Sequence, residues 1–188
     1  MSDCFCISQL HFPLSATFLA LPLEEQPKWQ FQALQEELKD FENCLRFQNP
    51  QTPHVTLYYW QEVMEIEYQQ IHAQAQKIAA GRAPFTMRVT HADTFGSRGE
   101  DRVLLLEVAF SEELARLKKS CPWPDGRPFH PHITLARISH PQRFATIKKK
   151  VMKALDDCAF AIPVDRLRLY AEIDGRKQTP LEDYSFSS

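Results

Sequence analysis

The sequence predicts an α+β protein that folds as one compact unit with two similar halves. Strand-like and helix-like segments follow one another as strand–helix–strand, a pair of strands, and strand–helix–strands. A five-residue segment recurs at an equivalent place in each half, and no linker or low-complexity tract divides the 188 residues. We therefore expect a single domain over residues 15–188, preceded by a flexible N-terminal segment, residues 1–14.

The first half contains two strands, each followed by a helix. Residues 16–21 (ATFLAL) are apolar and end at Pro22, which favours a strand, and residues 54–60 (HVTLYYW) are β-branched and aromatic. Apolar residues at steps of three and four predict a helix over residues 28–45. A second helix is expected over residues 66–80, which end at a glycine.

The second half begins with a strand pair, in which residues 85–89 alternate in polarity and residues 102–110 are nearly all apolar. Gly96 and Gly99 are expected in the turn between them. The acidic start of residues 111–120 predicts a short helix, whereas the four prolines of residues 121–131 exclude regular structure. A strand, an amphipathic helix and closing strands complete the chain, at residues 132–138, 144–155, 160–163, 166–173 and 184–186.

Composition places this protein among ordinary globular domains and excludes several classes. No apolar run approaches the roughly 20 residues of a membrane span, and no secretory signal opens the chain. The five cysteines are odd in number and form no C-x-x-C pair, which agrees with the cytoplasm. A net charge of −2 is unlike that of proteins that coat long nucleic acids. Nothing indicates an obligate protein partner, so we expect a cytoplasmic monomer.

The repeated segment carries the chemistry. It reads Pro53-His54-Val55-Thr56-Leu57 in the first half and Pro131-His132-Ile133-Thr134-Leu135 in the second. Each copy starts a predicted strand, where residues two apart share a face, so His54 lies beside Thr56 and His132 beside Thr134. If a pseudo-two-fold axis relates the halves, the two pairs face each other across a groove.

Such an arrangement suits the cleavage of a phosphodiester. In-line attack needs a base on the entering oxygen and an acid on the leaving oxygen, and histidine can act as either near neutral pH. Threonine hydroxyls can donate hydrogen bonds to the non-bridging oxygens, where charge grows in the transition state. No cofactor is implied, and no metal is expected, because His130 and His132 have no evident third ligand nearby.

The paired His-x-Thr motifs resemble those of the 2H (two-histidine) phosphoesterase superfamily, especially its RNA 2′,3′-cyclic phosphodiesterases, also called 2′-5′ RNA ligases. Residues 15–23 (SATFLALPL), 129–137 (FHPHITLAR) and 167–186 resemble further family segments. The resemblance implies a bilobal, LigT-like fold, with two antiparallel sheets and flanking helices around a central groove. It also implies an RNA or oligonucleotide terminus as partner, hydrolysis of its cyclic phosphate to a 2′-phosphate, and weak 2′-5′ joining.

Carried over residue by residue, the resemblance makes His54, Thr56, His132 and Thr134 the catalytic set. Arg137 matches the family's arginine after the second motif and becomes a candidate phosphate or nucleotide contact. A regular strand would point Arg137 away from His132, so this role requires a bulge or the end of the strand. Tyr59 stands where the family usually has phenylalanine, and is a candidate to stack on a base or to pack in the core.

Alternatives remain open at this point. The family usually continues Phe-Leu-Gly after the first motif, whereas this chain has Tyr59-Trp60-Gln61, so its nucleotide-binding rim departs from the family pattern. A phosphodiesterase for 2′,5′-linked oligonucleotides or small cyclic sugar phosphates would share the two-histidine site, and a non-catalytic nucleotide-binding module would share the fold. Arg166 and Arg168 share one strand face and are further candidates to line the groove.

Overall fold

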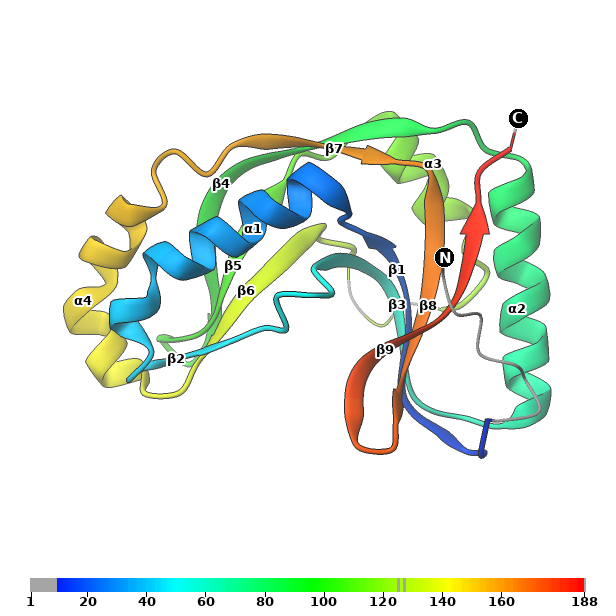
Figure 1. Cartoon of the computed structure of the whole chain (residues 1–188), viewed down its shortest axis with the longest axis horizontal. Coiled ribbons are helices and arrows are strands. Elements are labelled where there is room, and N and C mark those ends of the chain that lie inside the picture. The colour runs from blue at the N-terminus through cyan, green and yellow to red at the C-terminus, as the bar shows by residue number, and fades with distance from the viewer. Residues whose placement is uncertain (1–9, 125, 127, 188) are drawn as a thin grey trace.

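Two antiparallel β-sheets stand side by side in the computed structural model, which describes residues 10–124, 126 and 128–187 (Figure 1). The predicted flexible segment falls partly on residues 1–9, which lie outside the described residues. The sheets have four strands in the order β3-β1-β8-β9 and five in the order β2-β6-β5-β4-β7. The four-stranded sheet contains β1 (Leu14–Pro22), β3 (His54–Val63), β8 (Arg166–Ile173) and β9 (Arg176–Ser185). The five-stranded sheet contains β2 (Leu45–Phe47), β4 (Phe85–Ser97), β5 (Glu100–Val108), β6 (His132–Ile138) and β7 (Phe160–Val164).

This architecture confirms the predicted α+β fold with two antiparallel sheets. The two sheets do not coincide with the two halves of the sequence, however. Strand β2 comes from the first half but pairs with β6, and β8 and β9 come from the second half but join β1. The two motif strands, β3 and β6, thus belong to different sheets and approach each other between them.

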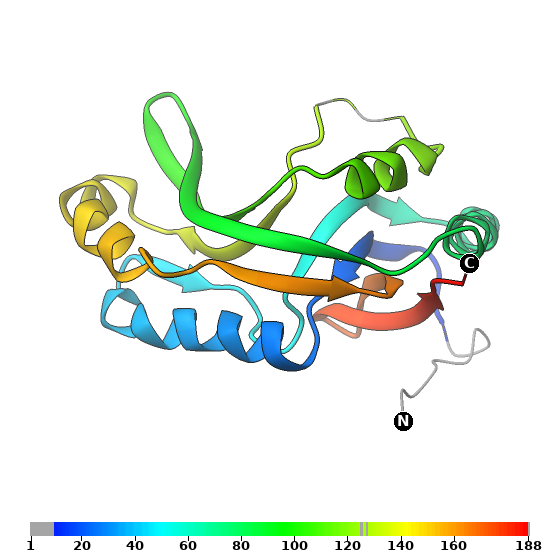
Figure 2. The same cartoon turned by 90° about the horizontal axis from the view of Figure 1, so that it is seen from above.

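The helices cover the outer faces of the sheets. Helix α2 (Glu65–Ala80) packs on β8 and β9, while α4 (Pro141–Ala154) packs on β5 and α1 (Glu25–Glu37) contacts β7 (Figures 1 and 2). Helix α3 (Glu112–Ser120) is capped by Ser111, whose hydroxyl accepts a hydrogen bond from the Leu114 N–H. No helix of the described residues is long and apolar enough to cross a bilayer.

The helix expected over residues 28–45 was wrong at both ends. Helix α1 starts at Glu25 and ends at Glu37, and the chain then passes through the 3₁₀ turn η2 (Lys39–Phe41) into β2. The apolar spacing misled because Leu38 and Leu45 are both buried although neither lies in the helix. Tertiary packing, and not helical periodicity, sets the spacing beyond residue 37.

Smaller differences concern the hairpins. Gly96 lies within β4 and not in the turn, which is formed by Arg98 and Gly99, both with positive φ. A Cβ at residue 96 would come within 1.8 Å of the Glu100 carbonyl oxygen, so only glycine fits there. The last strand is also longer than expected, because β9 begins at Arg176, directly after the Asp174–Gly175 turn.

The four-stranded sheet buries apolar residues on both faces. On the α2 face, Leu19, Leu21 and Val55 belong to the main hydrophobic core. On the opposite face a separate small cluster consists of Phe18, Ala20 and Tyr170. This second cluster supports the site described next, and its face is called the groove face.

Candidate active site

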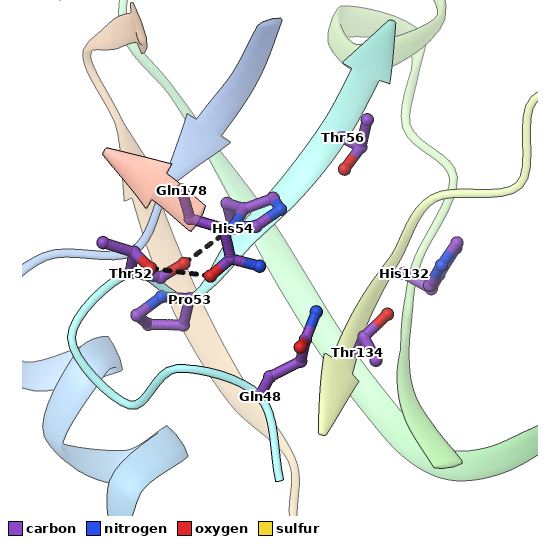
Figure 3. A pocket seen from close by; sticks show the side chains of 8 residues that line it. All are labelled: Gln48, Thr52, Pro53, His54, Thr56, His132, Thr134 and Gln178. Carbon is purple, nitrogen blue, oxygen red and sulfur yellow. Dashed lines mark hydrogen bonds between the residues drawn. The ribbon is translucent and has the colours of Figure 1, made fainter. Parts of the chain in front are cut away.

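The two predicted His-x-Thr pairs line one pocket between the sheets (Figure 3). His54 and Thr56 come from β3, and His132 and Thr134 come from β6. The cavity between the lining side chains is about 20 Å³, far less than the roughly 300–1,000 Å³ of sites that enclose a drug-sized ligand. The pocket therefore suits one terminal group of a larger molecule. Its lining is completed by Gln48, Thr52, Pro53 and Gln178.

Both imidazoles are held in the same way by the backbone. Nδ1 of His54 lies 2.7 Å from the Thr52 carbonyl oxygen, and Nδ1 of His132 lies 2.8 Å from the His130 carbonyl oxygen. A carbonyl can only accept, so each Nδ1 carries the proton and donates it. In the neutral ring the lone pair then resides on Nε2, which is the nitrogen left for a ligand.

His54 is embedded among aromatic rings on the groove face. Its ring stacks on Phe18 at a centroid distance of 4.6 Å, and Phe18 stacks in turn on Tyr170 at 4.8 Å. Burial lowers the pKa of His54 to about 4, although the hydrogen bond to Thr52 acts in the opposite direction; charge on His132 lowers it further. His54 is therefore neutral near pH 7, the form that a general base requires.

His132 has a different and more polar environment. Its ring meets the edge of Phe95, with centroids 5.0 Å apart, and its direct cross-strand partner is Glu107 of β5. The Glu107 carboxylate lies 2.7 Å from Nε2 of His130, the residue whose carbonyl accepts from His132. A carboxylate thus stands near the second histidine, whereas aromatic rings surround the first.

A β-bulge follows the threonine in the first motif strand. Ala20 pairs with Thr56 and the adjacent Leu19 pairs with Tyr58, so Leu57 is an extra residue in β3. Its carbonyl oxygen accepts a hydrogen bond from the Lys118 ammonium at 2.5 Å. The bulge shifts the alternation of side chains along β3. Tyr58 therefore faces away from the groove and Tyr59 faces it.

The second motif strand contains the matching bulge. Leu105 pairs with Thr134 and Leu104 with Ala136, so Leu135 is the extra residue in β6. Its carbonyl oxygen accepts from the Gln48 N–H, which continues the pairing of β2 with β6, at 3.0 Å and from the Gln35 side-chain amide at 3.1 Å. Gln35 is buried in α1 and also donates to the Gln48 carbonyl at 3.0 Å.

These bulges bring Tyr59 and Arg137 onto the groove face. Tyr59 is the direct partner of Phe18, the ring on which His54 stacks, and its side chain is 55% exposed. Arg137 pairs with Val103, which shares a β5 face with the partners of Thr134 and His132. The role predicted for Arg137 requires a bulge that turns this residue toward the groove, and the structure has that bulge at Leu135. Neither Tyr59 nor Arg137 lines the pocket itself.

Trp60 lies on the other face of its sheet. It pairs with Thr17 and its ring lies 4.9 Å from Trp123, within an aromatic cluster that includes Tyr58. Residues 60 and 59 project to opposite faces, so the departure from the family at Trp60 does not alter the groove face.

Three polar residues of the pocket were not predicted. Gln48 follows β2, Thr52 precedes the first motif, and Gln178 has a positive φ of 60° near the start of β9. The Thr52 hydroxyl donates to the Gln178 side-chain oxygen at 2.9 Å, which joins two residues 126 positions apart in the sequence. No local pattern marks these residues, since only the fold brings them together.

Arg166 and Arg168 both form ion pairs within the protein. Arg166 contacts Asp165 and Asp183, and Arg168 contacts Asp183 and Glu24. These carboxylates neutralise both guanidinium groups. Among the described residues, no three histidine, cysteine or acidic side chains are gathered as ligands for a metal ion.

Comparison with known proteins agrees with this geometry. Residues 24–176 match the model of the 2′-5′ RNA ligase superfamily. The RNA 2′,3′-cyclic phosphodiesterase of Bacillus subtilis (strain 168) is 29% identical over 131 residues, which are 64% of this chain and 69% of that protein. The fold matches the crystal structure of TT0787 of Thermus thermophilus, with a TM-score of 0.72 and 24% identity over 91% of this chain and 97% of that one.

A second solved structure repeats the match in fold. Escherichia coli LigT, crystallised in complex with 3′-AMP, gives a TM-score of 0.61 and 21% identity, covering 93% of this chain and 99% of LigT. The family model spans most of the sequence and includes both His-x-Thr strands. The chain therefore belongs to the 2′-5′ RNA ligase superfamily, as its paired motifs predict.

Proposed function

We propose that this protein is a cyclic phosphodiesterase that hydrolyses a terminal 2′,3′-cyclic phosphate of RNA or an oligonucleotide to a 2′-phosphate, without a metal ion. One observation carries the proposal: two imidazoles from different sheets line one pocket, each with Nδ1 bound to a backbone carbonyl and Nε2 left for substrate. The name of the B. subtilis relative supports the choice of substrate.

The two histidines take different roles because their surroundings differ. His54, kept neutral by burial, removes a proton from the attacking water through Nε2. The water oxygen bonds to phosphorus as the bond between phosphorus and the 3′-oxygen breaks. His132 acts in its imidazolium form, with both ring nitrogens protonated, and gives its Nε2 proton to the departing 3′-oxygen. Thr56 and Thr134 donate hydrogen bonds to the non-bridging oxygens as their charge increases.

The same site supports 2′-5′ joining as a side activity. If the 5′-hydroxyl of a second strand replaces the attacking water, the phosphorus–3′-oxygen bond breaks in the same way and a 2′-5′ linkage remains. Neither histidine changes its role in that reaction. The description of the family supports this second activity.

The first test is hydrolysis of an oligonucleotide with a 2′,3′-cyclic end in the presence of a chelator. We expect a 2′-phosphate product, identified by chromatography against 2′- and 3′-phosphate standards. His54→Ala and His132→Ala should each lower kcat by about 10²–10⁴-fold, the usual contribution of general acid–base catalysis. His140→Ala, an exposed histidine at the start of α4, serves as the matched control and should leave kcat unchanged. Turnover close to wild type in either catalytic variant would exclude a two-histidine mechanism.

The second test separates the acid from the base. A substrate with sulfur in place of the 3′-oxygen has a leaving group that needs no protonation. We expect His132→Ala to recover most of its lost rate on this substrate, and His54→Ala to recover none. The reverse pattern would exchange the two roles.

A further inference from the structure

Two amide side chains lie at one end of the pocket that contains the histidines. Figure 3 shows the amide nitrogens of Gln48 and Gln178 turned toward the space that the two histidines line. In the part of the chain that the structure describes, neither amide nitrogen donates a hydrogen bond to the protein. An amide nitrogen carries two N–H donors and accepts nothing. Both nitrogens are therefore available as donors to a ligand in the pocket.

The backbone of Gln178 has a conformation that glutamine rarely adopts. Its φ is 60°, in the left-handed region that favours glycine, asparagine and aspartate. Gln178 also belongs to a β-bulge, because Lys177 and Gln178 of β9 together stand opposite the single residue Glu172 of β8. Residues in this conformation persist where the surrounding structure enforces it, and they are concentrated at functional sites. The backbone thus indicates that the Gln178 side chain is needed at this place.

Thr52 determines which end of the Gln178 amide faces the pocket. The Thr52 hydroxyl donates to Oε1 of Gln178 at 2.9 Å, so Nε2 of Gln178 is turned the other way, into the pocket (Figure 3). The Thr52 carbonyl oxygen accepts from Nδ1 of His54 at 2.7 Å. Thr52 therefore orients the imidazole through its backbone and the amide through its side chain.

Neutral donors must balance much of the charge of a phosphodiester in this pocket. The described residues that line it include no lysine or arginine, and only His132 acts as a cation in the proposed mechanism. Removing a charged group from water costs free energy unless new hydrogen bonds replace those of water. Each non-bridging oxygen can accept more than one hydrogen bond, so the hydroxyls of Thr56 and Thr134 leave acceptor capacity unfilled. Because the cavity is only about 20 Å³, a group between the histidines also lies beside the two amides.

We propose that Gln178 and Gln48 donate hydrogen bonds from their side-chain amides to the non-bridging oxygens of the bound phosphodiester, and that Thr52 is a positioning residue for Gln178. The proposal rests on the proposed function, because it places the cyclic phosphate between His54 and His132. It extends the set of donors beyond the two threonines to residues outside the repeated motifs. The charge on the non-bridging oxygens increases in the transition state, so these hydrogen bonds strengthen as the reaction proceeds.

The experiment uses an oligonucleotide with a 2′,3′-cyclic phosphorothioate end, in which sulfur replaces one non-bridging oxygen or the other in two separable diastereomers. Sulfur accepts hydrogen bonds weakly, so a donor contributes little to the diastereomer that presents sulfur to it. Gln178→Leu should lower kcat/KM by about 10–100-fold on the oxygen substrate and on one diastereomer, but little on the other. The ratio of kcat/KM between the diastereomers should therefore change by about the same factor. A ratio equal to that of the wild type would overturn the contact with a non-bridging oxygen.

Gln178→Asn is the second variant at this position, because asparagine adopts a positive φ readily and its amide is one methylene shorter. Its circular dichroism should match that of the wild type, while kcat/KM and the diastereomer ratio should change as in Gln178→Leu. A wild-type ratio in this folded variant would equally overturn the contact. Gln48→Leu should also lower kcat/KM and change the ratio, and an unchanged ratio would remove Gln48 from the set of donors.

Thr52→Val removes the hydroxyl that orients Gln178 but keeps the carbonyl that binds His54. It should lower kcat/KM and change the diastereomer ratio in the same direction as Gln178→Leu, and Thr52→Ser should restore both. A wild-type ratio in Thr52→Val would exclude the positioning role. Gln70→Leu removes an exposed amide of α2 and serves as the matched control, with no change expected in either quantity.

Failure of the amide donors and failure of the proposed function give different results. If the wild-type protein hydrolyses the cyclic ends and the glutamine variants keep its diastereomer ratio, the donors are wrong and the function stands. If the wild-type protein hydrolyses no cyclic end, the function is wrong. Calorimetric binding of inorganic phosphate then still decides the donors: a dissociation constant about tenfold higher in Gln178→Leu supports them, and equal constants exclude them.

Discussion

The burial of His54 should make the stability of this protein depend on pH below neutrality. The folded-state pKa of His54 is about 4, against about 6.5 in an unfolded chain. As the pH falls below 6.5, His54 binds a proton in the unfolded state but not in the folded state. The contribution of His54 to stability is therefore complete above about pH 6.5 and is lost as the pH falls towards 4.

The magnitude follows from these two pKa values. At pH 5 about 97% of unfolded chains but only about 9% of folded molecules carry the proton, and the free energy of unfolding falls by about 2 kcal/mol between pH 7 and pH 5. The full loss, reached below pH 4, is about 3 kcal/mol. Several carboxylates also titrate towards that lower limit, so pH 5 is the better point for measurement.

The assay is urea unfolding followed by circular dichroism at pH 8, 7 and 5, under reducing conditions. The comparison is His54→Asn, because the Asn amide can still donate to the Thr52 carbonyl but cannot titrate. Wild type should lose about 2 kcal/mol more than the variant between pH 7 and pH 5. Between pH 8 and pH 7 the free energy of unfolding should change by the same amount in the two proteins. Equal losses between pH 7 and pH 5 would refute the buried, neutral state of His54.

Three further outcomes follow from the groove face and from the bulge in β6. Phe18→Leu removes the ring on which His54 stacks, so less burial should raise the His54 pKa towards 6.5; the acidic limb of the pH profile of kcat/KM should move to higher pH. An unmoved limb would show that Phe18 does not set this pKa. Ala20→Leu places a larger side chain beside Thr56 on the face where the His54 and Phe18 rings stack. It should cost about 1–3 kcal/mol of stability, measured in urea, and reduce kcat; a fully active variant would mean that this space is not needed. Gln35→Leu leaves the Leu135 and Gln48 carbonyls without the amide that joins them and should cost about 1–3 kcal/mol. Unchanged urea unfolding would refute this role of Gln35.

Local sequence was sufficient to predict the two motif strands and the two His-x-Thr pairs that meet in the pocket. The pattern His-x-Thr at the start of a β-branched strand depends only on the alternation of side chains, and β6 spans the predicted residues His132–Ile138. The resemblance to the family was also recognised from these motifs, because both histidines recur with the same neighbours.

Tertiary structure alone decided how the site is completed. The sequence gives no sign that β2 leaves the first half to pair with β6, which places Arg46 opposite Arg137. Nor does it reveal that Gln178 meets Thr52 across 126 residues. Such pairings depend on register between distant strands, which no local periodicity encodes.

The bulges at Leu57 and Leu135 are the clearest case. Simple alternation in β6 would turn Arg137 away from His132, and simple alternation in β3 would do the same to Tyr59. At the bulges the Leu57 carbonyl accepts a hydrogen bond from Lys118, and the Leu135 carbonyl accepts from Gln35 and from the Gln48 N–H, so neither carbonyl is left without a donor. The sequence alone determined which residues are capable of chemistry, and the bulged register between paired strands decided which of them face the groove.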